Sequence, residues 1–250
     1  MPGRAARTPS TLLASPRPGS RPSRCQPQSS PRIPLCSERS NLSRPYSCRM
    51  VSVLLDGVTK TFPDGPALSG ITLRIDDGSS VVLLGPSGSG KTTVLRLIAG
   101  IDRPDSGEIL FDGIDVGDQP PFERNIAMFS QESTLYPHMS ARRNIGFPLQ
   151  ARKTAEPERT KRVEAEARAF SVTRMLEKMP SQMSAGQQRL VQLARTMVRV
   201  PDVFLIDEPF GALDASHRRL LRAELRSLQT GYEVTTIYAT HDQEDAMALA

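Results

Sequence analysis

The residues with the clearest capacity for chemistry form a glycine-rich segment directly after a short apolar run. Residues 85–92 read G-P-S-G-S-G-K-T and fit the pattern G-x-x-x-x-G-K-[ST]. Glycines allow the backbone to curl so that N–H groups point inward, and a helix N-terminus attracts anions. The Lys91 ammonium adds positive charge for the β- and γ-phosphates of a nucleotide, and the Thr92 hydroxyl can bind Mg²⁺. The expected phosphate-binding residues are Gly85, Pro86, Ser87, Gly88, Ser89, Gly90, Lys91, Thr92 and Thr93.

Two carboxylates end a second apolar run. Residues 202–208 read D-V-F-L-I-D-E, a near-continuous apolar stretch typical of a parallel strand that is covered on both faces. Ligands of open α/β sheets bind at the carboxyl ends of the strands, so Asp207 and Glu208 are expected to face the phosphate-binding segment. Asp207 would support Mg²⁺ beside Thr92, and Glu208 would polarise an attacking water. The alternative is that these acids simply open a surface loop.

The elements that must hold these residues are expected to alternate between strand and helix. Residues 81–84 read as a strand, and residues 92–99 have helical apolar spacing that ends at Gly100. Residues 106–113 read as short strands with an Asp-Gly turn. No apolar run approaches the roughly 18–20 residues that a membrane-spanning helix needs. On these features alone the chain is a nucleotide-binding protein, a class that includes GTPases, kinases and ATPases.

Further motifs narrow the class, because together they resemble the ATPases of ATP-binding cassette (ABC) transporters. Residues 184–188, S-A-G-Q-Q, resemble the signature sequence of that family, and residues 129–132, F-S-Q-E, resemble its Q-loop. Residues 212–214, A-L-D, resemble the D-loop, and residues 235–242 resemble the strand that carries the switch histidine. The resemblance covers about residues 51–250, and the order and spacing of the motifs make it specific.

The resemblance implies an α/β fold of the P-loop NTPase class. The ABC ATPase form of this fold adds an antiparallel β subdomain and a helical subdomain, which we place at about 132–182. The chain stops at Ala250, inside a helix expected to begin near Asp242. Because family members continue with further strands, we expect residues 50–250 to be an ABC ATPase domain that is truncated at its C-terminus.

The same resemblance assigns roles to single residues. Phe62 would stack on adenine, although an aromatic side chain in that position could instead pack in a core. His241 would hydrogen-bond the γ-phosphate and hold Glu208, where a lone histidine is otherwise most often structural. Gln131 would touch Mg²⁺ or the attacking water, an assignment that depends wholly on the resemblance. The expected catalytic residues are Glu208, His241 and Gln131, and the expected metal ligands are Thr92, Gln131 and Asp207.

The signature implies that two chains act together. The Ser184 hydroxyl and the helix N-terminus that follows would face the γ-phosphate bound to a second copy or a homologous subunit. ATP would hold such a dimer closed, and hydrolysis would release it. The further nucleotide contacts expected from the resemblance are Ser184, Gly186, Gln187 and Asp214. Ala185 replaces the usual glycine and adds a methyl group, and Leu190 stands where an arginine is common, so we expect one salt bridge to be missing.

The implied function is an ATP-binding and ATP-hydrolysing subunit that powers an ABC importer. Its partners would be integral-membrane permease subunits and, indirectly, a solute-binding protein, which places it at the cytoplasmic face of the cell membrane. Residues 135–149 resemble importers of the maltose and glycerol-phosphate type, so a carbohydrate is the favoured solute. Alternatives are an importer ATPase for polyamine, iron or another small solute, an ABC ATPase outside transport, and a subunit that binds ATP without hydrolysing it.

The charge of the chain is divided unevenly. Residues 1–49 contain nine arginines and one acidic residue, a formal charge of +8, within a formal net charge of +5 for all 250 residues. The remaining 201 residues are therefore slightly acidic, which argues against a nucleic-acid partner. A Pro/Ser/Arg-rich composition predicts a disordered tail for residues 1–49. It is compatible with a mis-assigned start upstream of Met50, with a genuine extension and with a targeting segment.

Overall fold

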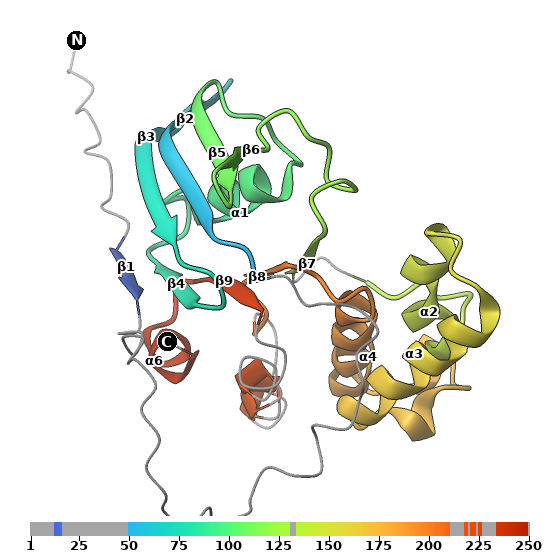
Figure 1. Cartoon of the computed structure of the whole chain (residues 1–250). Coiled ribbons are helices and arrows are strands. Elements are labelled where there is room, and N and C mark those ends of the chain that lie inside the picture. The colour runs from blue at the N-terminus through green and yellow to red at the C-terminus, as the bar shows by residue number, and fades with distance from the viewer. Residues whose placement is uncertain are drawn as a thin grey trace, which may run out of the picture.

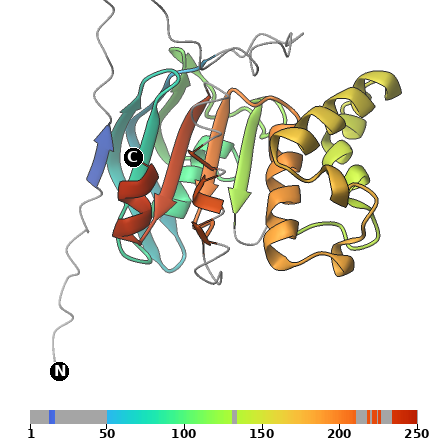
Figure 2. The ribbon, with the colours of Figure 1, turned by 90° about the horizontal axis from the view of Figure 1, so that it is seen from below.

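The computed structural model describes the backbone of residues 13–16 and all atoms of residues 50–130, 134–210, 218–219, 221–223, 225–226 and 234–249. These residues form a central sheet, an antiparallel sheet beside it, and a group of helices beyond one edge of the central sheet (Figures 1 and 2). This arrangement confirms the predicted fold class, with both its antiparallel β subdomain and its helical subdomain. Among the described residues, no helix is long and apolar enough to cross a membrane.

The central sheet is built mainly from parallel strands. Its order is β1-β4-β9-β8-β7, and β4, β9, β8 and β7 run parallel to one another. The strand bounds are β1 (Leu13–Pro16), β4 (Ser80–Leu84), β9 (Thr235–Thr240), β8 (Val203–Asp207) and β7 (Ile126–Ser130). Figure 2 shows these strands side by side, with the helices of the middle part of the chain beyond β7.

The register of the parallel strands brings their carboxyl ends level. Leu84 lies opposite Thr240, Asp207 lies opposite Ala239, and Ser130 lies opposite Asp207. When parallel strands end in register, the segments that follow them all start at one edge of the sheet, where α/β proteins bind ligands. In this chain those segments start at residues 85, 131, 208 and 241, and they carry the predicted site.

Strand β1 was not expected. Residues 13–16, within the segment predicted to be a disordered tail, pair antiparallel with β4 from Leu13 opposite Leu84 to Pro16 opposite Val81. An edge strand offers unpaired backbone N–H and C=O groups to any extended segment. Composition that excludes a hydrophobic core therefore does not exclude a strand. The other residues of the predicted tail lie outside the described residues.

The antiparallel sheet has the order β3-β2-β5-β6. Its strands are β2 (Val53–Phe62), β3 (Gly65–Ile75), β5 (Ser106–Phe111) and β6 (Ile114–Asp115). The predicted Asp-Gly turn joins β5 to β6, because Phe111 pairs with Ile114 and leaves two residues in the loop. Those two residues have φ values of 50° at Asp112 and 78° at Gly113, as a two-residue hairpin of this type requires.

Two hydrophobic clusters cover opposite faces of the central sheet. Val81, Leu83, Leu205 and Ile237 point toward the cluster that includes helix α1 (Lys91–Ala99) and the antiparallel sheet. The alternate residues of the same strands point to the other cluster, which contains Val82, Phe204, Ile206 and Tyr238. Side chains of a strand alternate between faces, so continuous apolar runs are what a doubly covered sheet needs.

The remaining helices pack outside this sheet. Their bounds are α2 (Ala141–Ala151), α3 (Glu156–Ala169), η1 (Thr173–Met175), η2 (Pro180–Gln182), α4 (Ala185–Met197) and α6 (Gln243–Leu249). Helices α2 and α3 pack on α4, and α4 packs on β7. Residues 218–219, 221–223 and 225–226 are also helical, and we call them the 218–226 helical residues. Helix α6 follows β9 directly and packs on β4 and β9.

Candidate nucleotide site

The phosphate loop, residues 85–92, connects β4 to α1. Gly90 is the N-cap of α1 and has a φ of 91°, in the left-handed region where side chains are strained. A Cβ atom at Gly90 would lie 2.8 Å from Leu68 Cδ2 and 2.9 Å from the carbonyl oxygen of Ala67. The loop therefore lies tightly against the start of β3, and only glycine fits at this position.

The Lys91 side chain is folded into this loop. The residue is 5% exposed, and its Nζ donates to the carbonyl oxygens of Gly85 at 2.8 Å and Pro86 at 3.0 Å. The Ser89 hydroxyl is also buried, and it has no hydrogen-bond partner among the described residues. A buried cation and an unsatisfied hydroxyl in a curled backbone are the groups that a phosphate would engage. The residues present thus fit a bound polyphosphate.

The predicted metal ligands from the two apolar runs meet across the sheet edge. Thr92 Oγ1 donates to Asp207 Oδ1 at 3.2 Å, although 115 positions separate them in the chain. Asp207 is 8% exposed and ends β8. A hydroxyl and a carboxylate are hard oxygen ligands, which suit Mg²⁺ that keeps several of its waters. The third predicted ligand, Gln131, lies outside the described residues.

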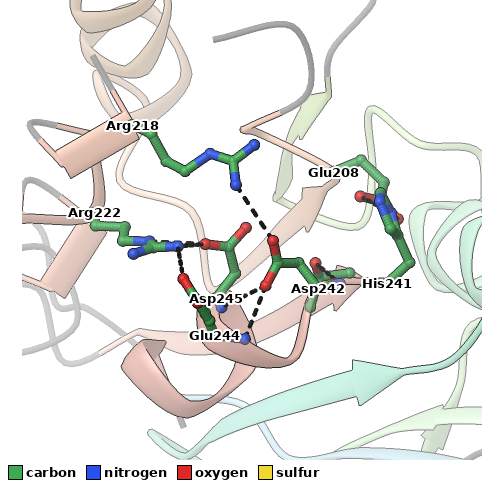
Figure 3. Close-up of polar contacts among 8 residues, drawn as sticks. Glu208, Arg218, Arg222, His241, Asp242, Glu244 and Asp245 are labelled. Atoms are coloured by element: carbon green, nitrogen blue, oxygen red, sulfur yellow. Dashed lines mark hydrogen bonds and ion pairs between the residues drawn. The ribbon is translucent and has the colours of Figure 1, made fainter. Parts of the chain in front are cut away.

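Glu208 and His241 form a second pair at the same edge. His241 Nδ1 lies 2.8 Å from a Glu208 carboxylate oxygen, and the side chains are 58% and 27% exposed respectively (Figure 3). Glu208 has a φ of 44°, a strained value for a residue with a side chain. Backbone strain of this kind occurs where surrounding structure holds a functional side chain in place. Two of the three predicted catalytic residues are therefore brought together, and the third, Gln131, lies outside the described residues.

Two arginines of the 218–226 helical residues belong to a polar network beside this pair (Figure 3). Arg218 Nη1 lies 3.2 Å from Asp242 Oδ2, and Arg222 Nε donates to Asp245 Oδ1 at 2.7 Å. The Asp242 Oδ1 atom accepts from the backbone N–H groups of Glu244 at 2.8 Å and Asp245 at 3.3 Å. The sequence analysis did not single out these arginines, although their four-residue spacing places them on one helical face.

The Arg222–Asp245 pair is expected to stabilise the fold. Asp245 is 3% exposed, so replacing Arg222 by Met would leave a buried carboxylate without its cation. We expect this change to lower the free energy of unfolding by about 3 kcal/mol, measured by urea denaturation. Arg219→Met is the matched control because Arg219 is exposed on the same helix, and it should change stability by less than about 0.5 kcal/mol. Equal losses in both variants would contradict this assignment.

The signature residues form a helix cap apart from this edge. Ser184 is the N-cap of α4: its Oγ accepts from the Gln187 N–H at 3.3 Å, and Gln187 Oε1 accepts from the Ser184 N–H at 3.1 Å. Ser184 and Ala185 are exposed, whereas Gly186 is buried. No hydrogen bond or ion pair in the described part of the chain joins Ser184, Gly186 or Gln187 to the phosphate loop.

Three further predictions concern single residues. Phe62 ends β2 half-buried, with Lys60 Nζ 5.6 Å from its ring centroid, and its role in stacking on adenine stays a prediction. Asp214, like Gln131, lies outside the described residues. Leu190 is 8% exposed and packs in the core, while Arg189 beside it donates to the Ser130 carbonyl oxygen at 3.3 Å. That a salt bridge is missing at Leu190 stays a prediction.

Sequence comparisons identify relatives across most of the chain. A family model described as ABC transporter matches residues 68–211. The sn-glycerol-3-phosphate import ATP-binding protein UgpC of Roseobacter denitrificans is 44% identical over 202 residues, which cover 80% of this chain and 56% of UgpC. The trehalose import ATP-binding protein SugC of Mycobacterium tuberculosis is 43% identical over 80% of this chain and 51% of SugC. The sulfate/thiosulfate import ATP-binding protein CysA of Thermosynechococcus vestitus is 46% identical over 80% of this chain and 60% of CysA.

The chain thus spans little more than half the length of these curated relatives. A structural comparison gives the same family. The ATP-binding cassette MJ0796, reported as a dimer in a post-hydrolysis state bound to ADP and Pi, has a TM-score of 0.67 and 32% identity to this chain. The match covers 78% of this chain and 90% of MJ0796. With the family model matching more than half of its residues, this chain belongs to the ABC transporter family.

Proposed function

We propose that this protein is the ATP-binding and ATP-hydrolysing subunit of an ABC importer. The observation that carries the proposal is the meeting of a phosphate loop, a Thr92–Asp207 pair and a Glu208–His241 pair at one edge of the central sheet. Phosphoryl transfer to water needs a loop that binds the phosphates, oxygen ligands for a metal ion and a carboxylate that acts as base. All three lie together in this proposal.

In this proposal the phosphate loop binds the β- and γ-phosphates of ATP and Lys91 neutralises part of their charge. Thr92, Asp207 and Gln131 would hold Mg²⁺, which would supply positive charge against the phosphates. Glu208 accepts the proton of the attacking water at its carboxylate. His241 donates to the γ-phosphate and holds the Glu208 carboxylate in position. Phe62 stacks on the adenine ring.

The dimer is the second part of the proposal. Ser184, Gly186, Gln187 and Asp214 face the nucleotide of a second copy or a homologous subunit. The N-terminus of α4 supports this, because Ser184 and Ala185 are exposed and a helix N-terminus attracts an anion. The relative MJ0796 is reported as a dimer, which agrees with such an arrangement.

The transport partners follow from the relatives. We propose that the chain binds integral-membrane permease subunits at the cytoplasmic face of the cell membrane and serves a solute-binding protein indirectly. A carbohydrate is the preferred solute, since SugC is named for trehalose import and UgpC for sn-glycerol-3-phosphate import. CysA is named for sulfate and thiosulfate, and it supports import of another small solute as the second candidate. Co-purification of a permease pair, followed by uptake assays, separates these solutes.

We further propose residues 50–250 as the ABC ATPase domain, with a helical subdomain at about 132–182. Residues 1–49 would then lie outside the working cassette apart from the β1 pairing. Deleting residues 1–49 is the direct test, because it should leave nucleotide binding unchanged.

Phosphate release by the full chain tests the proposed activity. With ATP and Mg²⁺ the protein should release inorganic phosphate, and chelating the metal with EDTA should abolish the release. Binding of a fluorescent ATP analogue is measured in parallel. Binding without any phosphate release would favour the alternative of a subunit that holds ATP without hydrolysing it. Absence of both would contradict the proposal.

Ala185 offers a prediction about the proposed dimer. Replacing Ala185 by Gly removes one methyl group at the exposed start of α4, where a second subunit would approach. We expect ATP-dependent dimerisation to become about fivefold tighter, the effect of relieving one crowded methyl contact. Sedimentation of the Glu208→Gln form with and without Ala185→Gly measures this. An unchanged dimerisation constant would show that the methyl group is accommodated.

A further inference from the structure

Besides its 2.8 Å contact with Glu208, His241 is positioned by its neighbours along the chain. Its side chain is 58% exposed, so burial does little to orient the imidazole. The residue stands between Thr240, which ends β9, and Asp242, which precedes α6. Because the peptide that joins His241 to Asp242 is planar, fixing Asp242 also restricts the direction in which His241 leaves the backbone.

Asp242 is fixed from three directions. Its backbone N–H donates to Thr240 Oγ1 at 3.0 Å. One carboxylate oxygen accepts the N–H groups at the start of α6, and the other lies 3.2 Å from Arg218 Nη1. Burial acts to raise the pKa of the Asp242 carboxyl, but those N–H groups and the Arg218 charge outweigh it and hold the pKa below its ordinary value. Asp242 is therefore a permanent anion at neutral pH.

Arg218 comes from a different part of the chain. It belongs to the 218–226 helical residues, whose second arginine, Arg222, is paired with the buried Asp245 (Figure 3). The Arg222 guanidinium also lies 5.7 Å from the Phe210 ring centroid, and Phe210 packs against Tyr238 with centroids 6.1 Å apart. Phe210 follows Glu208 by two positions, and Tyr238 precedes His241 by three. The 218–226 helical residues are thus anchored beside both members of the Glu208–His241 pair.

We propose that Arg218 is a positioning residue for the Glu208–His241 pair, acting through its ion pair with Asp242. The 218–226 helical residues hold the Arg218 guanidinium in place, and this cation holds the Asp242 carboxylate. Asp242 in turn restricts the backbone next to His241, and so the direction from which the imidazole contacts Glu208. This inference rests on the proposed function, since it assigns Arg218 to the same site. Arg218 does not touch the nucleotide in this scheme, so it is not a catalytic residue.

The test compares Arg218→Gln with Arg218→Lys in the full chain. Arg218→Gln should lower kcat for phosphate release about fivefold, the change that corresponds to a partly exposed ion pair. The dissociation constant for ATP should stay within about twofold of the wild-type value, because the phosphate loop is untouched. Arg218→Lys keeps the cation and should recover most of the loss. Arg219→Gln, an exposed neighbour, is the matched control and should leave kcat unchanged.

Two mutant cycles separate positioning from a general structural effect. Asp242→Asn keeps a good helix cap but removes the anion, so it should lower kcat as Arg218→Gln does, and the double variant should be no worse than either. In a His241→Ala background, Arg218→Gln should change kcat by less than about twofold. Full additivity in the His241→Ala background would overturn the proposal.

A readout independent of hydrolysis keeps the two proposals distinguishable. The chain has three histidines, and a ¹H–¹³C spectrum assigned with His241→Ala identifies the His241 ring signal. Arg218→Gln should shift this signal while leaving that of His138 in place. An unmoved His241 signal would refute the role of Arg218 even if the wild type hydrolyses ATP. A wild type that binds ATP without hydrolysing it would refute the proposed function alone, provided that the shift is observed.

Discussion

Glu208→Gln is expected to lower phosphate release at least about 100-fold while ATP still binds. A general base contributes roughly 10²–10⁴ to a rate, and glutamine has nearly the same shape as glutamate but cannot accept the proton of the attacking water. The geometry indicates that the substitution changes the carboxylate without moving the backbone of residue 208. Glu208 is held by a backbone φ of 44° and by its N–H bond to the Ala239 carbonyl oxygen at 3.1 Å, and neither feature depends on the carboxylate. The loss should therefore appear in kcat rather than in the affinity for ATP.

The measurement is a steady-state phosphate-release assay combined with binding of an ATP analogue. Because the variant binds ATP without removing its γ-phosphate, ATP-bound dimers should also accumulate in gel filtration. Glu108→Gln is the control, since Glu108 is exposed on the antiparallel sheet. A wild type as inactive as Glu208→Gln would favour the non-catalytic binding role. A variant that retains wild-type activity would remove Glu208 from the proposed mechanism.

Lys91→Met is expected to weaken ATP binding about 100-fold. The methionine stem fills nearly the same buried space as the lysine stem, so the change removes mainly the ammonium. Lys91 is 5% exposed and donates to two carbonyl oxygens of its own loop, which shows that the positive charge lies inside the phosphate cradle. Two charge-assisted contacts to phosphate oxygens at about 1.5 kcal/mol each correspond to roughly 100-fold in affinity.

Comparing nucleotides makes this prediction specific to the phosphates. Lys91→Met should weaken binding of ATP and leave binding of AMP nearly unchanged, because AMP lacks the β- and γ-phosphates that the ammonium would contact. Titration calorimetry with both nucleotides measures the difference, and Lys161→Met, on the exposed face of α3, serves as the control. An equal loss for ATP and AMP would indicate a damaged fold, and no loss for ATP would place the phosphates elsewhere.

The phosphate loop and the acidic strand end could be predicted because their signals are local. The spacing of glycines before Lys91 specifies a curled backbone whatever the rest of the chain does, and the N-cap φ of 91° at Gly90 agrees with it. The apolar runs before Gly85 and Asp207 likewise predict buried strands without reference to distant residues. The order of the motifs then pointed to the family, which the comparisons confirmed.

Contacts between distant parts of the chain could not be predicted in the same way. The polar network around Asp242 joins residues separated by more than 20 positions. From sequence alone, arginines in a helix are normally assigned to its solvent-exposed face. The pairing of β1 with β4 was missed because backbone hydrogen bonding is nearly independent of side-chain composition. The contact of Arg189 with the Ser130 carbonyl oxygen at the end of β7 likewise joins residues 59 positions apart.

The sequence by itself therefore determined which groups are available for the proposed chemistry: a glycine-rich loop with a lysine, a hydroxyl and a carboxylate suited to Mg²⁺, a glutamate and a histidine. Only the tertiary structure decided that Thr92 meets Asp207 at 3.2 Å and that His241 meets Glu208 at 2.8 Å. The reason is physical. Motifs set backbone geometry over a few residues, whereas the distances between motifs are set by the register of parallel strands and by the burial that holds those strands together.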